Sequence, residues 1–222
     1  MRNFFNLESS FMVFLSNLTD VVLLNALCLI CCIPIVTIGP SVTAMHYVTL
    51  KMAREEEGYI IKSFFKAFKE NFKQSFIVWM VFLVISGIFL LDYKILEASG
   101  MENSRIFIIV IGAIYLFVCF TTMYIFPLLS RFENTLKQTV KNALFMSILH
   151  IFKTILMAVI YVIPFVVAPL HYNLLLVFLI IGMSGPAYIN SFIWKSIFKK
   201  YEPEDIVEEE IVSDEEFHVA EE

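Results

Sequence analysis

Charged residues are scarce in this sequence, and the few present lie mostly outside its long apolar stretches. Of 222 residues, 17% are charged and 59% are hydrophobic, and the mean hydropathy is +0.79. An average soluble domain carries about 25% charged and about 45–50% apolar residues. Exposing the surplus apolar surface to water would cost roughly 25 cal/mol per Å², a cost that lipid removes. The composition therefore excludes an ordinary soluble domain and predicts a membrane protein.

The sequence also lacks the motifs that carry common chemistry. It contains no GxxxxGK[ST], GxGxxG, GxSxG or HExxH motif. Cys28 and Cys31 have CxxC spacing, but no second pair and no nearby histidine completes a metal site. We expect no catalytic residue, no metal and no cofactor, and we predict that the chain is not an enzyme.

Charges inside membrane spans mark ion and proton pathways, and they are nearly absent here as well. Asp20 falls at the predicted outer end of the first span, and Asp92 and Glu97 follow the second. Asn25 and Asn190 are the main uncharged polar residues at depth, and we expect both to bridge helices. A proton relay is therefore not predicted.

What the sequence does have is a series of apolar segments that approach the length of a bilayer crossing. About 20 mostly apolar residues span the hydrocarbon core. Because the apolar residues do not alternate with polar ones, these segments are helices and not barrel strands. We predict an all-α fold, a polytopic transmembrane bundle of about five spans. The five segments are residues 18–36, 76–91, 106–129, 154–169 and 174–194.

Lysine and arginine counts predict an orientation in the membrane. With five spans, alternate connecting segments carry 13 basic residues on one side and 3 on the other. The base-rich side is the cytoplasmic one. This prediction puts the N-terminus outside and the C-terminus in the cytoplasm.

The last residues form a separate region of different composition. Residues 201–222 contain eleven acidic residues and no lysine or arginine, whereas residues 1–200 contain 16 bases and 10 acids. We predict a transmembrane domain over residues 1–200 and an acidic, disordered cytoplasmic tail over residues 201–222.

The first cytoplasmic loop is predicted to contain helices of its own. One covers residues 43–54, and a second, amphipathic helix carries phenylalanines on one face and lysines on the other. The second helix either lies on the membrane surface, with its lysines near anionic headgroups, or extends the second span and packs on its neighbours. The two alternatives are compatible.

This loop is the candidate surface for a partner or for lipid. Thr37, Gly39 and Pro40 shape its beginning, and an acidic cluster follows Arg54. The candidate residues are Thr37, Gly39, Pro40, Arg54, Glu55, Glu56, Glu57, Lys62, Lys66, Lys69 and Lys73.

Several of these stretches resemble a known family. They include PIVTIGP at residues 34–40, MAREEE at 52–57, SFFKAFKENFKQ at 63–74, and RFEN at 131–134. Together they resemble the YesL-type family of bacterial integral membrane proteins. The resemblance implies a five- or six-helix membrane protein without an established activity, encoded near carbohydrate ABC importers and polysaccharide-degrading enzymes.

We therefore expect a non-catalytic accessory or regulatory subunit associated with a carbohydrate ABC importer. One alternative is a permease-like transport component, although Arg54 to Gly58 only partly matches the coupling loop of such permeases. Another is a membrane enzyme acting on lipid or envelope glycan, which would use Asp20 with Asp92 or Glu97. No nucleic-acid partner is expected.

Overall fold

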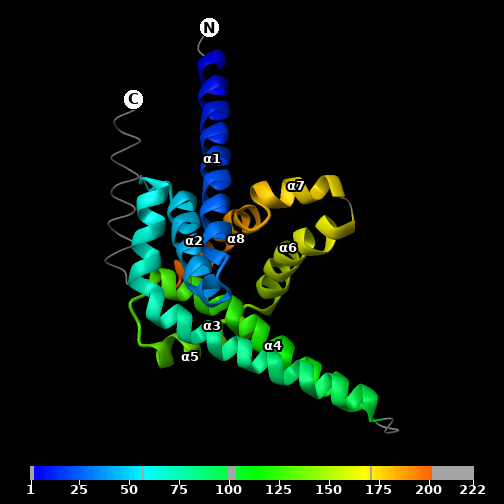
Figure 1. The fold of residues 1–222 in the computed structure, drawn as a ribbon. Helices are drawn as coiled ribbons and strands as arrows, with labels where there is room; N and C mark the ends of the chain where they lie inside the picture. The colour runs from blue at the N-terminus through cyan, green and yellow to red at the C-terminus, as the bar shows by residue number, and fades with distance from the viewer. Residues whose placement is uncertain (1–2, 57, 100–103, 171, 202–222) are drawn as a thin grey trace.

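A computed structural model describes residues 3–56, 58–99, 104–170 and 172–201 of the chain. In these ranges it contains eight α-helices, one 3-10 turn and no strand, which confirms the predicted all-α class (Figure 1). The predicted acidic tail and Glu57 lie outside the described residues, except for Tyr201. The helices are α1 (Asn3–Cys32), α2 (Ile38–Ala53), α3 (Ile60–Ala98), α4 (Ser104–Arg131), α5 (Leu136–Leu149), α6 (Ile151–Leu170), α7 (Tyr172–Ile181) and α8 (Ser184–Phe198).

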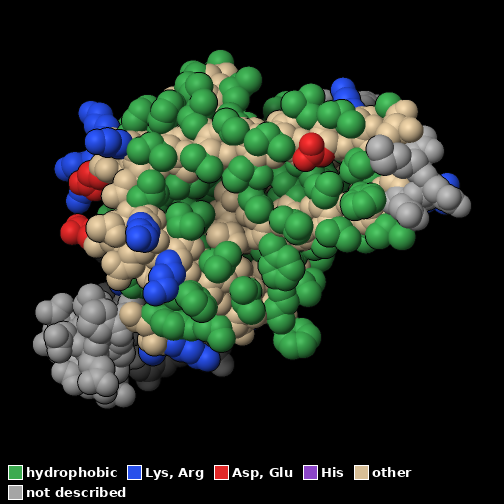
Figure 2. Space-filling view, turned by 90° about the horizontal axis from the view of Figure 1, so that it is seen from below, with side chains coloured by type: hydrophobic (Ala, Val, Ile, Leu, Met, Phe, Trp, Pro, Cys, Tyr) green, Lys and Arg blue, Asp and Glu red, His purple; other side chains and the backbone are tan. Residues whose placement is uncertain are grey.

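Four of these helices are long and apolar enough to cross a membrane, judged by length and composition among the described residues. Their spans are Leu15–Cys32, Ile60–Ala98, Ser104–Arg131 and Ile151–Pro169. Large apolar side chains cover their outer surfaces, and Figure 2 shows hydrophobic side chains over most of one face of the molecule. The four helices fit a membrane protein.

The short helix α2 forms the centre of the bundle. Eleven of its 16 residues are buried, and it packs against α1, α3, α4 and α8. Small side chains such as Ser41 and Ala44 let these neighbours approach closely, and Ala44 is completely buried. The sequence places a helix correctly at residues 43–54, but in a cytoplasmic loop. The structure places it in the core instead.

The helices α1 and α2 form an antiparallel hairpin. The 3-10 turn Ile35–Thr37 reverses the chain, and Trp79 of α3 donates its indole N–H to the carbonyl of Ile35 at 2.7 Å. Thr37 Oγ1 lies 2.6 Å from the Cys31 carbonyl oxygen. The end of α2 therefore returns to the level of Asp20.

This return differs from the arrangement predicted from sequence. There, the first span separates Asp20 from the lysines of the first loop. In the structure, Asp20 lines the same cavity as Lys62, Lys66 and Lys69. The difference arises because α2 crosses back through the bundle, although its 16 residues are fewer than the about 20 expected of a membrane span.

The fifth predicted span, residues 174–194, is not one continuous helix. It is divided into α7 and α8 at Gly182 and Met183. A Cβ atom at Gly182 would collide with the side chain and the carbonyl oxygen of Phe178, so the chain needs glycine at this break. The predicted continuous span is therefore interrupted at this point.

Asn25 of α1 satisfies the backbone groups that the break exposes. Its Nδ2 donates to the Leu179 carbonyl at 2.8 Å, and its Oδ1 accepts from the backbone N–H groups of Met183 and Ser184 at 3.0 and 3.1 Å. The side chain is fully buried. Asn190 likewise joins α8 to α6 through a 3.3 Å bond from its Nδ2 to the Met157 carbonyl. Both asparagines bridge helices, as predicted.

We expect Asn25→Leu to destabilise the fold strongly, because it leaves three buried backbone groups without their partner. At about 1–3 kcal/mol for each group, the loss is roughly 3 kcal/mol or more. Thermal unfolding of the purified protein in detergent measures it. The control is Asn17→Leu, on the same helix at a partly exposed position. Equal melting temperatures for the two variants would contradict the bridging role.

Candidate functional site at the base-rich end

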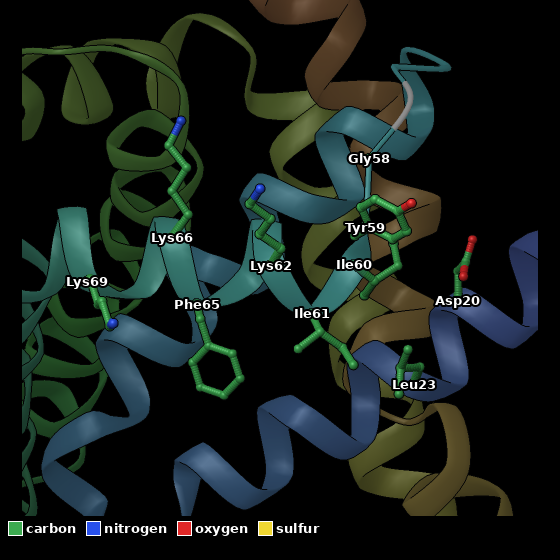
Figure 3. A pocket seen from close by; sticks show the side chains of 10 residues that line it. All are labelled: Asp20, Leu23, Gly58, Tyr59, Ile60, Ile61, Lys62, Phe65, Lys66 and Lys69. Atoms are coloured by element: carbon green, nitrogen blue, oxygen red, sulfur yellow. The ribbon is translucent and has the colours of Figure 1, made fainter.

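A groove lies between α1 and the first turns of α3 (Figure 3). Its volume is about 640 Å³. We call it the α1–α3 groove, and it is lined by Asp20, Leu23, Gly58, Tyr59, Ile60, Ile61, Lys62, Phe65, Lys66 and Lys69. Three of the predicted candidate lysines thus meet in one place.

The two sides of this groove differ in chemistry. Lys62 and Lys66 extend from α3 in one direction, while Ile61 and Phe65 point the other way, on the side where Leu23 of α1 lies (Figure 3). Lys69, further along α3, also turns toward the Phe65 side. All three groove lysines are exposed, whereas Phe64, on the opposite face of α3, is completely buried. The predicted amphipathic helix is therefore the beginning of α3, continuous with its span and packed on its neighbours. Lys73 is exposed but does not line the groove.

A second cavity of about 510 Å³ adjoins the groove and shares Asp20, Gly58 and Ile60 with it. It is the more polar of the two, and its lining includes Asn17, Lys51, Glu55, Glu56 and Tyr188. Burial, and then the negative charge of Glu55, raise the pKa of Tyr188, so its hydroxyl stays protonated at neutral pH.

Ion pairs join the helix ends around this second cavity. Glu56 lies 3.6 Å from Lys51 Nζ and 3.9 Å from Arg131 at the end of α4. Lys195 of α8 donates to the Ala53 carbonyl at 3.3 Å. Glu56, one of the acidic residues predicted as a partner surface, therefore ties α2 to α4. Arg54 precedes Glu55 and is partly buried.

Glu55 occupies an unusual backbone conformation that ends α2. Its φ is 62°, in the left-handed region that normally favours glycine. The N–H groups of Glu55 and Glu56 donate to the carbonyls of Met52 and Lys51, which is the hydrogen-bond pattern of a Schellman cap. The turn redirects the chain from α2 into α3, so it positions Gly58 and Tyr59 at the groove.

Thr37, Gly39 and Pro40 lie at the other end of α2 from this corner. Gly39 and Pro40 are buried, and a Cβ at Gly39 would come within 2.6 Å of both the Ser75 carbonyl oxygen and Trp79 Cβ. These residues set the contact between α2 and α3, while the groove lies some four turns away along α2. The structure does not bring them together with the lysines.

A buried polar cluster at the centre of the bundle has no counterpart in the sequence predictions. His46 of α2 lies 3.4 Å from the hydroxyl of Tyr161, and its Nδ1 has no partner among the described residues. His46 is almost completely buried. The sequence does not predict the contact between His46 and Tyr161, because this contact depends on the burial of α2.

No acid–base pair forms from the carboxylates that the enzyme alternative requires. Asp20 lies beside the first turns of α3, whereas Asp92 follows Lys69 by 23 residues on the same helix. At about 1.5 Å per residue, the separation along the helix is roughly 35 Å. Among the described residues, no three His, Cys, Asp or Glu side chains converge as metal ligands.

Residues 21–93 match a family model described as "Protein of unknown function, DUF624". The matched segment contains the C-terminal part of α1, all of α2 and most of α3, and therefore nearly the whole α1–α3 groove. No curated protein and no solved structure matches the chain. The match relates the groove-forming segment to an uncharacterised family and assigns no activity.

We expect Glu55→Gly to stabilise the protein by about 0.5–1 kcal/mol, because glycine adopts a positive φ without steric cost. A thermal-unfolding comparison in detergent tests this, with Glu55→Gln as the control that removes only the charge. A lower melting temperature for Glu55→Gly than for Glu55→Gln would show that the side chain, and not the backbone, governs this turn.

Gly39→Ala is expected to destabilise the protein by about 1–3 kcal/mol, because the added methyl meets fixed backbone atoms of α3. The matched control is Gly112→Ala in α4, where a Cβ would meet no described atom within 4 Å. We expect the control to melt at or slightly above the wild-type temperature. A Gly39→Ala protein as stable as the control would refute the close α2–α3 contact.

Proposed function

We propose that this chain is a non-catalytic accessory or regulatory subunit that associates with a carbohydrate ABC importer in the bacterial cytoplasmic membrane. The observation that carries the proposal is the hairpin of α3 and α4, which extends beyond the rest of the bundle (Figure 1). The kind of partner follows from the YesL-type resemblance.

The hairpin offers an apolar stripe that the chain itself leaves uncovered. Five aliphatic side chains of α3 recur at intervals of three and four residues, with exposed fractions of 53–64%. Such spacing aligns side chains along one face of a helix and suits packing against another helix. These residues are Val81, Val84, Ile88, Leu91 and Ile95.

The inner face of the hairpin, by contrast, is already occupied. Phe89 stacks on Tyr115 of α4 at a centroid distance of 4.3 Å, and Ser86 Oγ lies 2.9 Å from the Tyr115 hydroxyl. A partner helix would therefore use the outer stripe without disturbing the hairpin. Gly87, beside Ile88, has open space around it and permits close approach of another backbone.

The two alternatives have less geometric support. A permease would present its coupling loop to an ATPase subunit, but Arg54, Glu55 and Glu56 cap α2 and join it to neighbouring helices. A glycan- or lipid-processing enzyme would need its carboxylates together, and Asp20 and Asp92 are far apart.

We further propose that the N-terminus lies on the same side of the membrane as the C-terminus, in the cytoplasm. Support comes from the α1–α2 hairpin, in which the end of α2 returns to the level of Asp20, near the start of the apolar segment Leu15–Cys32. Because Arg2 precedes α1, this orientation puts fourteen of the sixteen basic residues on one side. Only Lys94 and Arg105, near the tip of the α3–α4 hairpin, face the other side. The positive-inside rule is thus obeyed better than with the N-terminus outside.

Co-purification of the tagged full chain from its native membranes in mild detergent, followed by mass spectrometry, tests the proposed association. We expect permease subunits of a carbohydrate importer to be recovered. Gly87→Leu should reduce that recovery by blocking close helix approach, whereas Val159→Leu on the exposed face of α6 should not. Absence of importer subunits from the wild-type sample would contradict the proposal.

A further inference from the structure

We propose that the α1–α3 groove binds an anionic phospholipid, with the lipid phosphate held by Lys62, Lys66 and Lys69 and an acyl chain lying along Leu23, Ile61 and Phe65. This goes beyond the association with an importer, since it assigns a ligand to a site on this chain. It also holds whether or not such a partner exists.

The first argument is uncompensated charge. The three lysines occupy positions i, i+4 and i+7 of α3, so they share a helix face and repel one another. None of them forms an ion pair with a carboxylate in the part of the chain that the structure describes. A phosphate between them would remove this repulsion and gain charge-assisted hydrogen bonds.

The second argument is the start of α3 in the same groove. The helix begins at Ile60, and no side chain of its N-cap, Tyr59, bonds to its first N–H groups. The positive end of the helix dipole therefore faces the Tyr59 end of the groove, where Lys62 lies within its reach and Asp20 offsets part of its field.

The third argument is the apolar side, which distinguishes a lipid from a free anion. Leu23, Ile61 and Phe65 are 38%, 50% and 41% exposed, although they line a concave surface. A soluble phosphate would leave them uncovered. An acyl chain attached to the phosphate would pack against all three side chains.

Asp20 fixes where the phosphate sits. It lies at the Tyr59 end of the groove, whereas Lys66 and Lys69 lie toward the other end (Figure 3). Its carboxylate disfavours a phosphate at its own end, so the headgroup is placed along the lysines. With Lys62–Lys69 on the cytoplasmic side, the lipid belongs to the inner leaflet.

The test uses the purified full-length protein in detergent, incubated with equal amounts of phosphatidylglycerol and phosphatidylcholine. Native mass spectrometry then counts the lipid retained by each protein. We expect phosphatidylglycerol to be retained preferentially. The variant Lys62→Gln/Lys66→Gln/Lys69→Gln should lose that preference by roughly tenfold or more, since each lysine near an anionic headgroup contributes about 1 kcal/mol.

The matched control is Lys137→Gln/Lys141→Gln/Lys199→Gln, which removes the same charge from exposed positions outside the groove. It should retain phosphatidylglycerol like the wild type. An equal loss in both triple variants would overturn the site, because bulk charge would then explain the binding. The site is also overturned if the wild type shows no preference, or if millimolar inorganic phosphate displaces the lipid completely.

Phe65→Gln examines the apolar side separately. We expect it to weaken phosphatidylglycerol retention while leaving the melting temperature unchanged, since Phe65 is exposed and lies outside the core. Retention equal to that of the wild type would contradict the position assigned to the acyl chain.

Discussion

The burial of α2 is the constraint on which the rest of the structure depends. This helix is too short to be recognised as a span, yet it provides the common surface for α1, α3, α4 and α8. Its contacts require small residues, because Gly39 and Ala44 leave no room for larger side chains. With α2 in the core, its C-terminal end meets the ends of α4 and α8, and α3 must begin beside Asp20. The groove and the charged corner both follow.

Polar groups inside this bundle hold helices together where apolar contacts alone would not fix them. In an apolar solvent the hydrophobic effect between helices is weak, so hydrogen bonds and close packing decide their arrangement. Asn25 ties α1 to the α7–α8 break, and Thr43 and Ser75 join α2 to α3 at 2.8 Å. Tyr124 and Thr154 join α4 to α6 at the same distance. These bonds explain how a chain with so few charges adopts one arrangement.

The sequence predicts what depends on local composition. The helical class, the apolar character of the spans, the bridging asparagines and the lysine face of α3 all follow from residue type and spacing. It does not predict what depends on long-range packing. The residues from Thr43 to Arg54 are predicted as helix but placed in a loop, because nothing local reveals that small residues will be covered by four other helices. The division at Gly182 is not predicted from the sequence for a similar reason. The apolar stretch is continuous in sequence, and the backbone groups at the break are satisfied by Asn25, more than 150 residues away.

The most direct test of the α1–α2 hairpin is to measure on which side of the membrane the beginning of α1 and the beginning of α3 lie. In a chain whose four cysteines are replaced by alanine, single cysteines are introduced as Asn6→Cys, Glu70→Cys and Glu97→Cys, and intact cells are treated with a membrane-impermeant thiol reagent. The hairpin predicts that the cysteines at positions 6 and 70 react only after the cytoplasmic side is opened, and that the one at position 97 reacts from outside. Reaction of positions 6 and 97 from the same side, with position 70 protected, would contradict the return of α2 through the bundle.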